Sequence, residues 1–131
     1  MTFKVPCLAA LALCAAALSP SAPSPVHAAP YAASAVSWSR VGVAATEWRL
    51  VLSRRSVRAG NLIVQLQNQG EDGHDLAIRK TTGSATRRIR EQRPGQHADM
   101  TLRVSAGTYR LWCTLPGHKK LGMHATLKVS R

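Results

Sequence analysis

The feature that most constrains the fold is an alternation of apolar and polar residues with a period of two, which recurs over most of the chain beyond residue 46. Side chains of a β-strand point alternately to opposite faces, so this period indicates strands with one buried face. The alternation is present in six segments: 48–52, 62–66, 74–78, 98–104, 109–113 and 123–129. Residues typical of turns separate most of them, at 58–60, 68–70, 93–95 and 106–107. Short strands at this spacing, without a long helix, predict an all-β fold, a β-sandwich of about seven antiparallel strands.

The segment 81–92 does not follow this alternation. It is polar and, with the residue after it, carries Arg87, Arg88, Arg90 and Arg93. Its composition is compatible with a short helix or with an irregular surface excursion, and the sequence leaves the two open. With 131 residues, the chain is long enough for one domain and too short for two.

The N-terminus has the pattern of a secretory signal. Lys4 precedes an uncharged apolar run at 5–18 that is too short for a stable membrane span. The small residue Ala28 ends a plausible cleavage motif, so we expect a signal peptide at 1–28, an Ala/Ser-rich flexible arm at 29–40 and a domain at 41–131. A lipoprotein anchor at Cys14 is the alternative, but the preceding Leu11-Ala12-Leu13 puts a bulky Leu directly before the cysteine, where such signals carry a small residue. Export to the periplasm, or secretion, is the prediction.

The chain is strongly basic. It contains 18 Lys and Arg against 6 Asp and Glu, a net charge of +12, or +11 once Lys4 leaves with the signal. Such a charge suggests nucleic acid, an anionic membrane or an acidic protein as partner. An exported chain rarely meets nucleic acid, and nothing predicts stable membrane insertion after cleavage. We therefore expect a monomer that meets an acidic protein partner.

Signal cleavage also reduces the number of cysteines in the mature chain. Cys7 and Cys14 leave, so Cys113 is the single cysteine of the mature chain. Exported proteins usually pair their thiols. An unpaired thiol is therefore explained as a buried apolar residue, a metal ligand or a nucleophile.

Potential metal ligands lie at the ends of predicted strands, on the side of each strand that faces the core. His74, Cys113 and Met123 all lie on core parity at or near predicted strand ends, and His118 lies on the loop between the last two. Two imidazoles, a thiolate and a weak axial thioether are the donor set of blue-copper electron-transfer sites. These four residues are the predicted ligands of one mononuclear type 1 copper ion.

Other residues of suitable chemistry are less suitably placed. His124 has the opposite parity to Met123 and His97 precedes a strand, so both are expected to be solvated. Met100 shares its parity with Leu102 and is expected in the core. Trp112, beside Cys113, is expected to face outward and is not assigned to an electron path.

The residues in this order resemble the cupredoxins, the type 1 blue-copper proteins, and in particular the small single-domain plastocyanin- and azurin-like members. The resemblance rests on four stretches: 57–68, 73–76, 93–95 and 106–123. The last contains a Cys-x4-His-x4-Met loop with Pro-Gly before the His. The resemblance implies a Greek-key sandwich with His74 as the upstream ligand and Cys113, His118 and Met123 as the loop ligands. A carbonyl near Gly73 stays open as a further weak axial ligand.

One position departs from the family pattern. Asp75 stands where the family usually has Asn after the upstream His. We expect its carboxylate to accept a hydrogen bond from the Thr114 region and to tie the two ligand segments together. A carboxylate this close to copper is expected to lower the reduction potential.

Three functional classes follow, and the first is preferred. A single-domain Met-axial site suits a one-electron carrier between redox proteins; a copper carrier or sequestering protein would use the same ligands. A thiol enzyme, with Cys113 as nucleophile and His118 as base, lacks an orienting third group. An oxidase lacks a second histidine cluster, so the chain is not expected to be an enzyme.

The loop after Cys113 also predicts a docking face. The ring edge of His118 is expected nearest to solvent, among the apolar residues Leu115, Pro116 and Leu121. Lys119 and Lys120 follow directly and are predicted at the rim of a face that meets an acidic cytochrome or oxidase.

Overall fold

The computed structural model describes residues 38–131. The predicted signal peptide at 1–28 and most of the predicted arm lie outside the described residues. The last part of that arm does not: the first strand already begins at Trp38, where it pairs with Asn61. No helix in the described part is long and apolar enough to cross a membrane.

Nine strands and one short helix make up residues 38–131, rather than about seven strands. They are β1 Trp38–Thr46, β2 Arg49–Leu52, β3 Ser56–Arg58, β4 Gly60–Asn68, β5 His74–Lys80, β6 Thr86–Gln92, β7 His97–Val104, β8 Gly107–Trp112, α1 His118–Leu121 and β9 His124–Ser130. Three strands lie outside the six alternating segments: β1, the short β3 and β6.

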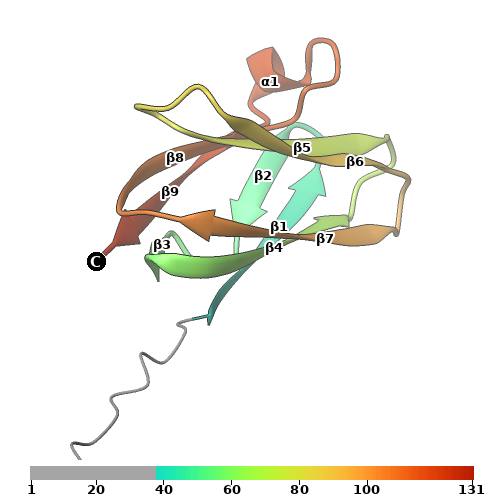
Figure 1. Cartoon of the computed structure of the whole chain (residues 1–131). Helices are drawn as coiled ribbons and strands as arrows, with labels where there is room; N and C mark the ends of the chain where they lie inside the picture. The colour runs from blue at the N-terminus through green and yellow to red at the C-terminus, as the bar shows by residue number, and fades with distance from the viewer. Residues whose placement is uncertain (1–37) are drawn as a thin grey trace, which may run out of the picture. The chain divides into compact units, whose positions relative to one another are not determined.

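The strands form two sheets that lie one above the other (Figure 1). One sheet has the order β2-β1-β4-β7 and the other β3-β9-β8-β5-β6. Most neighbours are antiparallel, but β1 pairs with β4 and β3 with β9 in parallel. The sheets are therefore mixed, and the expectation of antiparallel strands alone was wrong. Alternation reports which face of a strand is buried and carries no information on the direction of its neighbour.

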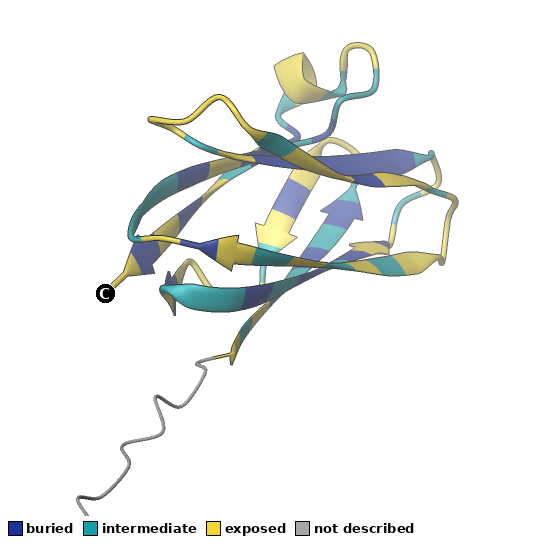
Figure 2. Cartoon of the chain, viewed as in Figure 1, coloured by how far each residue is buried: buried dark blue, intermediate teal, exposed yellow. Residues whose placement is uncertain are grey.

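The core lies between the sheets, and most strands carry buried residues at alternate positions (Figure 2). Leu62, Val64 and Leu66 of β4 are fully buried, as are Leu76 of β5 and Leu111 of β8. Burial of one such side chain stabilises a fold by roughly 1.5–3 kcal/mol. The sandwich thus has a core whose packing does not depend on a metal.

The segment 81–92 resolves into a turn followed by β6, which is an edge strand of the second sheet. Ile89 is its one buried residue, while Arg87, Arg88 and Arg90 are exposed. A strand at the edge of a sheet, with a neighbour on only one side, needs few apolar residues. Charged side chains on such a strand discourage pairing with another chain. Neither the helix nor the irregular excursion is therefore correct.

Candidate metal centre

The segments that carry the four predicted ligands are the ends of three strands and one helical turn. His74 is the first residue of β5, and Cys113 follows directly on β8. His118 begins α1, and Met123 immediately precedes β9. Because β5, β8 and β9 are neighbours in one sheet, their ends on this side meet at one place.

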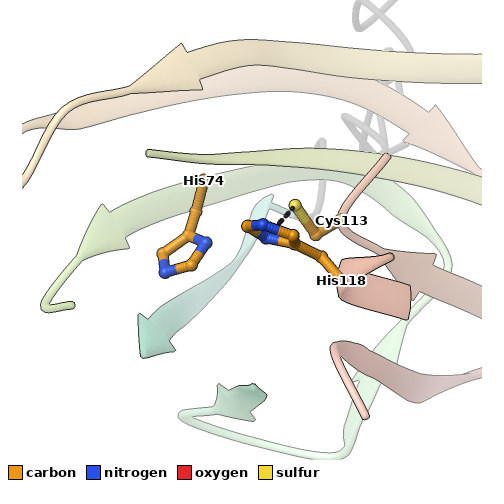
Figure 3. Close-up of side chains that lie close together, drawn as sticks. All are labelled: His74, Cys113 and His118. Carbon is orange, nitrogen blue, oxygen red and sulfur yellow. Dashed lines mark hydrogen bonds between the residues drawn. The ribbon is translucent and has the colours of Figure 1, made fainter. Parts of the chain in front are cut away.

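Three of these side chains point toward one another (Figure 3). One ligand atom from each of His74, Cys113 and His118 lies within 4.8 Å of those of the other two. Cys113 Sγ and His118 Nδ1 are 3.6 Å apart. His74 and Cys113 are fully buried, and His118 is half-buried. Two imidazole nitrogens and one sulfur at this spacing are a donor set suited to copper or zinc.

One ring nitrogen of His74 has no hydrogen bond. His74 Nδ1 is the one fully buried side-chain nitrogen or oxygen without a hydrogen-bond partner in the described residues. Buried polar atoms are almost always satisfied, so an orphaned ring nitrogen calls for an explanation. A lone pair held free for a metal ion provides that explanation, and the residues present therefore fit a bound metal.

The other nitrogen of His74 meets Glu47, a residue that the sequence analysis did not single out. Glu47 Oε1 lies 3.2 Å from His74 Nε2. The backbone N–H of Asp72, and next that of Glu47 itself, lower the pKa of the Glu47 carboxyl to about 2. An ionised carboxylate only accepts hydrogen bonds, so the proton of the neutral imidazole lies on Nε2.

The sulfur of Cys113 is poorly placed for nucleophilic chemistry. Burial raises the pKa of the Cys113 thiol above its usual value, and the side chain is inaccessible to solvent. Reactive cysteines have a lowered pKa and partial exposure. The buried thiol therefore argues against the thiol-enzyme alternative.

Asp75 ties the two ligand segments together, as the sequence predicted. Its Oδ1 accepts a hydrogen bond of 2.5 Å from the Thr114 backbone N–H, and its Oδ2 accepts one from the Thr114 hydroxyl. Asp75 is nine-tenths buried. These two bonds connect the residue after His74 to the residue after Cys113.

Met123 is placed by its backbone. Its carbonyl accepts a hydrogen bond of 3.0 Å from Cys113 N, and its own N–H donates to His118 O at 3.1 Å. Its side chain is fully buried in the core. The backbone therefore fixes Met123 relative to both loop ligands.

The turn between β1 and β2 packs against both histidines. It consists of Glu47 and Trp48, and the Trp48 ring meets that of His118 edge to face, with centroids 4.9 Å apart. Gly122 permits this approach, because a Cβ there would lie 2.8 Å from the Trp48 carbonyl oxygen, and its φ of 124° disfavours other residues. No local pattern in the sequence links this turn to residues 27 to 74 positions away, so only the fold reveals it.

The residues set aside from the site remain outside it. His97 and His124 are exposed, and Met100 is half-buried against the core, as predicted. Trp112 is partly exposed on the outer face of its sheet. Two cations lie over its ring, with Arg79 Cζ 5.6 Å and Lys119 Nζ 5.1 Å from the centroid.

Comparison with solved structures finds the same fold in several copper proteins. A reduced auracyanin from Roseiflexus castenholzii matches with a TM-score of 0.58 at 18% identity, over 73% of this chain and 99% of that one. Auracyanin A, a blue copper protein from Chloroflexus aurantiacus, matches with a TM-score of 0.57 at 13% identity, over 72% and 100%. Rusticyanin from Thiobacillus ferrooxidans matches with a TM-score of 0.57 at 17% identity, over 70% and 76%. At these identities the matches show the fold alone.

The comparison of sequences is more specific. No curated protein is significantly similar to this chain. The model of the copper-binding proteins of the plastocyanin/azurin family matches residues 40–130, which include all four predicted ligands and nearly every strand. With the buried His-Cys-His group and its orphaned nitrogen, this match identifies the chain as a member of the plastocyanin/azurin family of copper-binding proteins.

Proposed function

We propose that this protein is a mononuclear type 1 copper protein that carries single electrons between redox proteins of the periplasm. The observation that carries the proposal is the buried group of His74, Cys113 and His118, in which a ring nitrogen is left free for a metal. These three residues are the proposed ligands, with Met123 as the weak axial one. Copper, when bound, supplies the Cu(II)/Cu(I) couple.

The protein part of this function is to hold the donors still. His74 is fixed by Glu47, Cys113 by the backbone of Met123, and the two segments by the Asp75–Thr114 pair. A donor set that does not rearrange suits both oxidation states and leaves little to reorganise when an electron moves. The periplasmic setting rests on the predicted signal at 1–28.

Copper retention separates an electron carrier from a copper carrier. The copper-loaded protein should be cycled between hexacyanoferrate(III) and ascorbate in the presence of a Cu(I)-specific chelator. An electron carrier is expected to retain its copper over many cycles. Transfer of the copper to the chelator within the first reductions would favour copper carriage instead.

Met123→Leu is expected to retain copper and the visible charge-transfer band while raising the reduction potential. Loss of the thioether removes a weak axial donor and leaves the three stronger donors in place. We expect the affinity for Cu(II) to fall about tenfold relative to Cu(I), which for one electron is about 59 mV. Protein-film voltammetry measures the shift; complete loss of copper would show that Met123 carries much more of the affinity.

The partner is proposed to dock on the end of the molecule where His118 reaches the surface. Exposed apolar side chains lie on this loop and its neighbouring turn: Pro116, Leu121, which is 57% exposed, and Trp48, which is 38% exposed and touches the His118 ring. Lys119 and Lys120 are exposed beside them. Lys119, over Trp112 together with Arg79, extends the basic rim onto the outer face of the second sheet. An apolar centre with a basic rim fits an acidic redox protein.

Changing both lysines to Glu is expected to slow electron transfer to an anionic partner at low salt. Rim charges act mainly on the association rate, so the rate constant should fall about tenfold and depend less on ionic strength. Stopped-flow oxidation by hexacyanoferrate(III), an anionic probe, measures this, with the optical spectrum of copper as the check that the site is intact.

The double variant Arg87→Glu/Arg103→Glu is the matched control. It makes the same change of net charge at exposed positions near the end of β5 opposite His74. A wild-type rate for the lysine variant together with a slowed control would move the docking face to the arginine-rich β6 edge.

A further inference from the structure

Glu47 reaches from the β1–β2 turn to the loop that leads into His74. A single oxygen, Oε1, accepts three contacts there: from Glu71 N at 2.7 Å, from Asp72 N at 3.0 Å and from His74 Nε2 at 3.2 Å. The same carboxylate therefore organises the backbone of the loop and the ring of His74. A carboxylate that served only to order a surface turn would not need the contact with a fully buried imidazole.

The loop leaves a space that fits this carboxylate. A Cβ on Gly70 would lie 2.2 Å from Glu47 Oε1 and 2.8 Å from its Cδ, so a side chain at residue 70 would displace the carboxylate. Asn68, which is buried, fixes the loop on its other side: its Nδ2 donates to Asp72 O at 2.7 Å and its Oδ1 accepts from Gly70 N at 2.9 Å. The loop therefore holds both the Glu47 carboxylate and His74 in place before any metal arrives.

The direction of the contact fixes what the other ring nitrogen can do. With the proton on Nε2, the lone pair of the imidazole is on Nδ1, the buried atom without a partner. A carboxylate behind a ligating histidine orients the ring and makes it a stronger donor. A negative charge near the metal also stabilises the doubly charged ion more than the singly charged one.

We propose that Glu47 is a positioning residue of the copper site, which holds the proton of His74 on Nε2 and thereby favours Cu(II) over Cu(I). The proposal rests on His74 being a copper ligand, as in the function proposed above. It is separate from the effect expected of Asp75, because Glu47 contacts His74, whereas the Asp75 carboxylate bonds to Thr114 and lies beside Cys113.

Two variants perturb Glu47 in different ways. Glu47→Gln keeps the shape of the side chain and removes its charge, whereas Gly70→Ala keeps the charge and displaces the carboxylate. Both are expected to lower the affinity for Cu(II) about tenfold more than that for Cu(I), because loss of a group that supports a ligand typically costs 10–100-fold in metal affinity. Competition titrations with Cu(II) and Cu(I) chelators measure the two affinities, and the potential should rise by the corresponding 59 mV or so.

Glu91→Gln is the matched control for charge alone. The Glu91 carboxylate lies against Gly73, next to His74 in the chain, since a Cβ on Gly73 would lie 2.0 Å from Glu91 Oε1. Glu91 has no hydrogen bond to His74. The Glu91→Gln variant is therefore expected to change the ratio of Cu(II) to Cu(I) affinity by less than threefold. Equal shifts for Glu47→Gln and Glu91→Gln, or ratios within twofold of wild type for both Glu47→Gln and Gly70→Ala, would overturn the proposal.

The position of the proton is measured without copper. Long-range ¹H–¹⁵N NMR of the metal-free protein is expected to show the His74 proton on Nε2, and a proton on Nδ1 would overturn the proposal. This readout separates it from the copper function itself. A protein that gives no thiolate-to-copper band, yet keeps the proton on Nε2, would overturn the blue-copper function and support the positioning of His74 by Glu47.

Discussion

Cys113→Ser is expected to abolish the intense visible band of the Cu(II) protein completely. The band is a charge transfer from a thiolate, and a serine hydroxyl is a harder donor that stays protonated at neutral pH. Affinity for copper should fall by more than the roughly 100-fold that loss of a group behind a ligand can cost. Optical spectra and competition titrations of the variant measure both effects, with far-UV dichroism as the check that it is folded.

His124→Gln is the control for this experiment. His124 is exposed at the start of β9, directly after Met123, and its side chain has the opposite parity. Its removal should leave the band and the affinity unchanged. A visible band that survived in Cys113→Ser, or one lost in His124→Gln, would mean that the copper ligands are assigned wrongly.

Removing the metal should leave the protein folded but less stable, the second large effect. Leu62, Leu76, Leu111 and Leu127 are fully buried between the sheets without any contribution from copper. A ligand that binds only the folded state stabilises it by mass action, by about 2.7 kcal/mol at a free concentration 100 times its dissociation constant and about 4.1 kcal/mol at 1,000 times. The free energy of unfolding should therefore rise with free copper by these amounts.

Urea denaturation at several buffered concentrations of copper measures this dependence. Cys113→Ser should unfold cooperatively as well, with a midpoint that responds much less to copper. A metal-free protein with the dichroism of a random coil would contradict the account, because folding would then depend on the metal as it does in small zinc domains.

Strands that alternate cleanly could be predicted from the sequence, and the ligands with them. The segment with Leu62, Val64 and Leu66 is β4, and His74 shares its buried parity with Leu76 and Ile78 on β5. Parity placed His74 and Cys113 on the buried side of neighbouring strand ends, and the structure brings His118 of the connecting loop to them. The resemblance to the cupredoxins predicted the bond between Asp75 and the Thr114 region, which the structure confirms.

Three strands, β1, β3 and β6, were missed. The strand β3 has only three residues, which is too few to show a period. In β1 the buried residues Val41, Val43 and Ala45 alternate with the small Gly42 and Ala44, so no polar residue marks the period. In β6, a single buried residue, Ile89, stands among exposed polar ones. The parallel pairings of β1 and β3 were missed as well, because strand direction depends on tertiary contacts.

The supporting residues of the site could not be predicted for a similar reason. Glu47 and Trp48 form a turn whose local sequence shows no metal-binding pattern, and each meets a histidine far along the chain. The glycines that admit them, Gly70 and Gly122, read as ordinary turn residues in the sequence. Their roles follow from the packing of the turn against the ligand loops.

The visible spectrum of the purified protein loaded with Cu(II) tests the central claim most directly. Coordination by the Cys113 thiolate with His74 and His118 predicts an intense blue charge-transfer band that disappears on reduction with ascorbate and returns on oxidation. A protein that binds one equivalent of copper but remains colourless would contradict the assignment of a type 1 site to these residues.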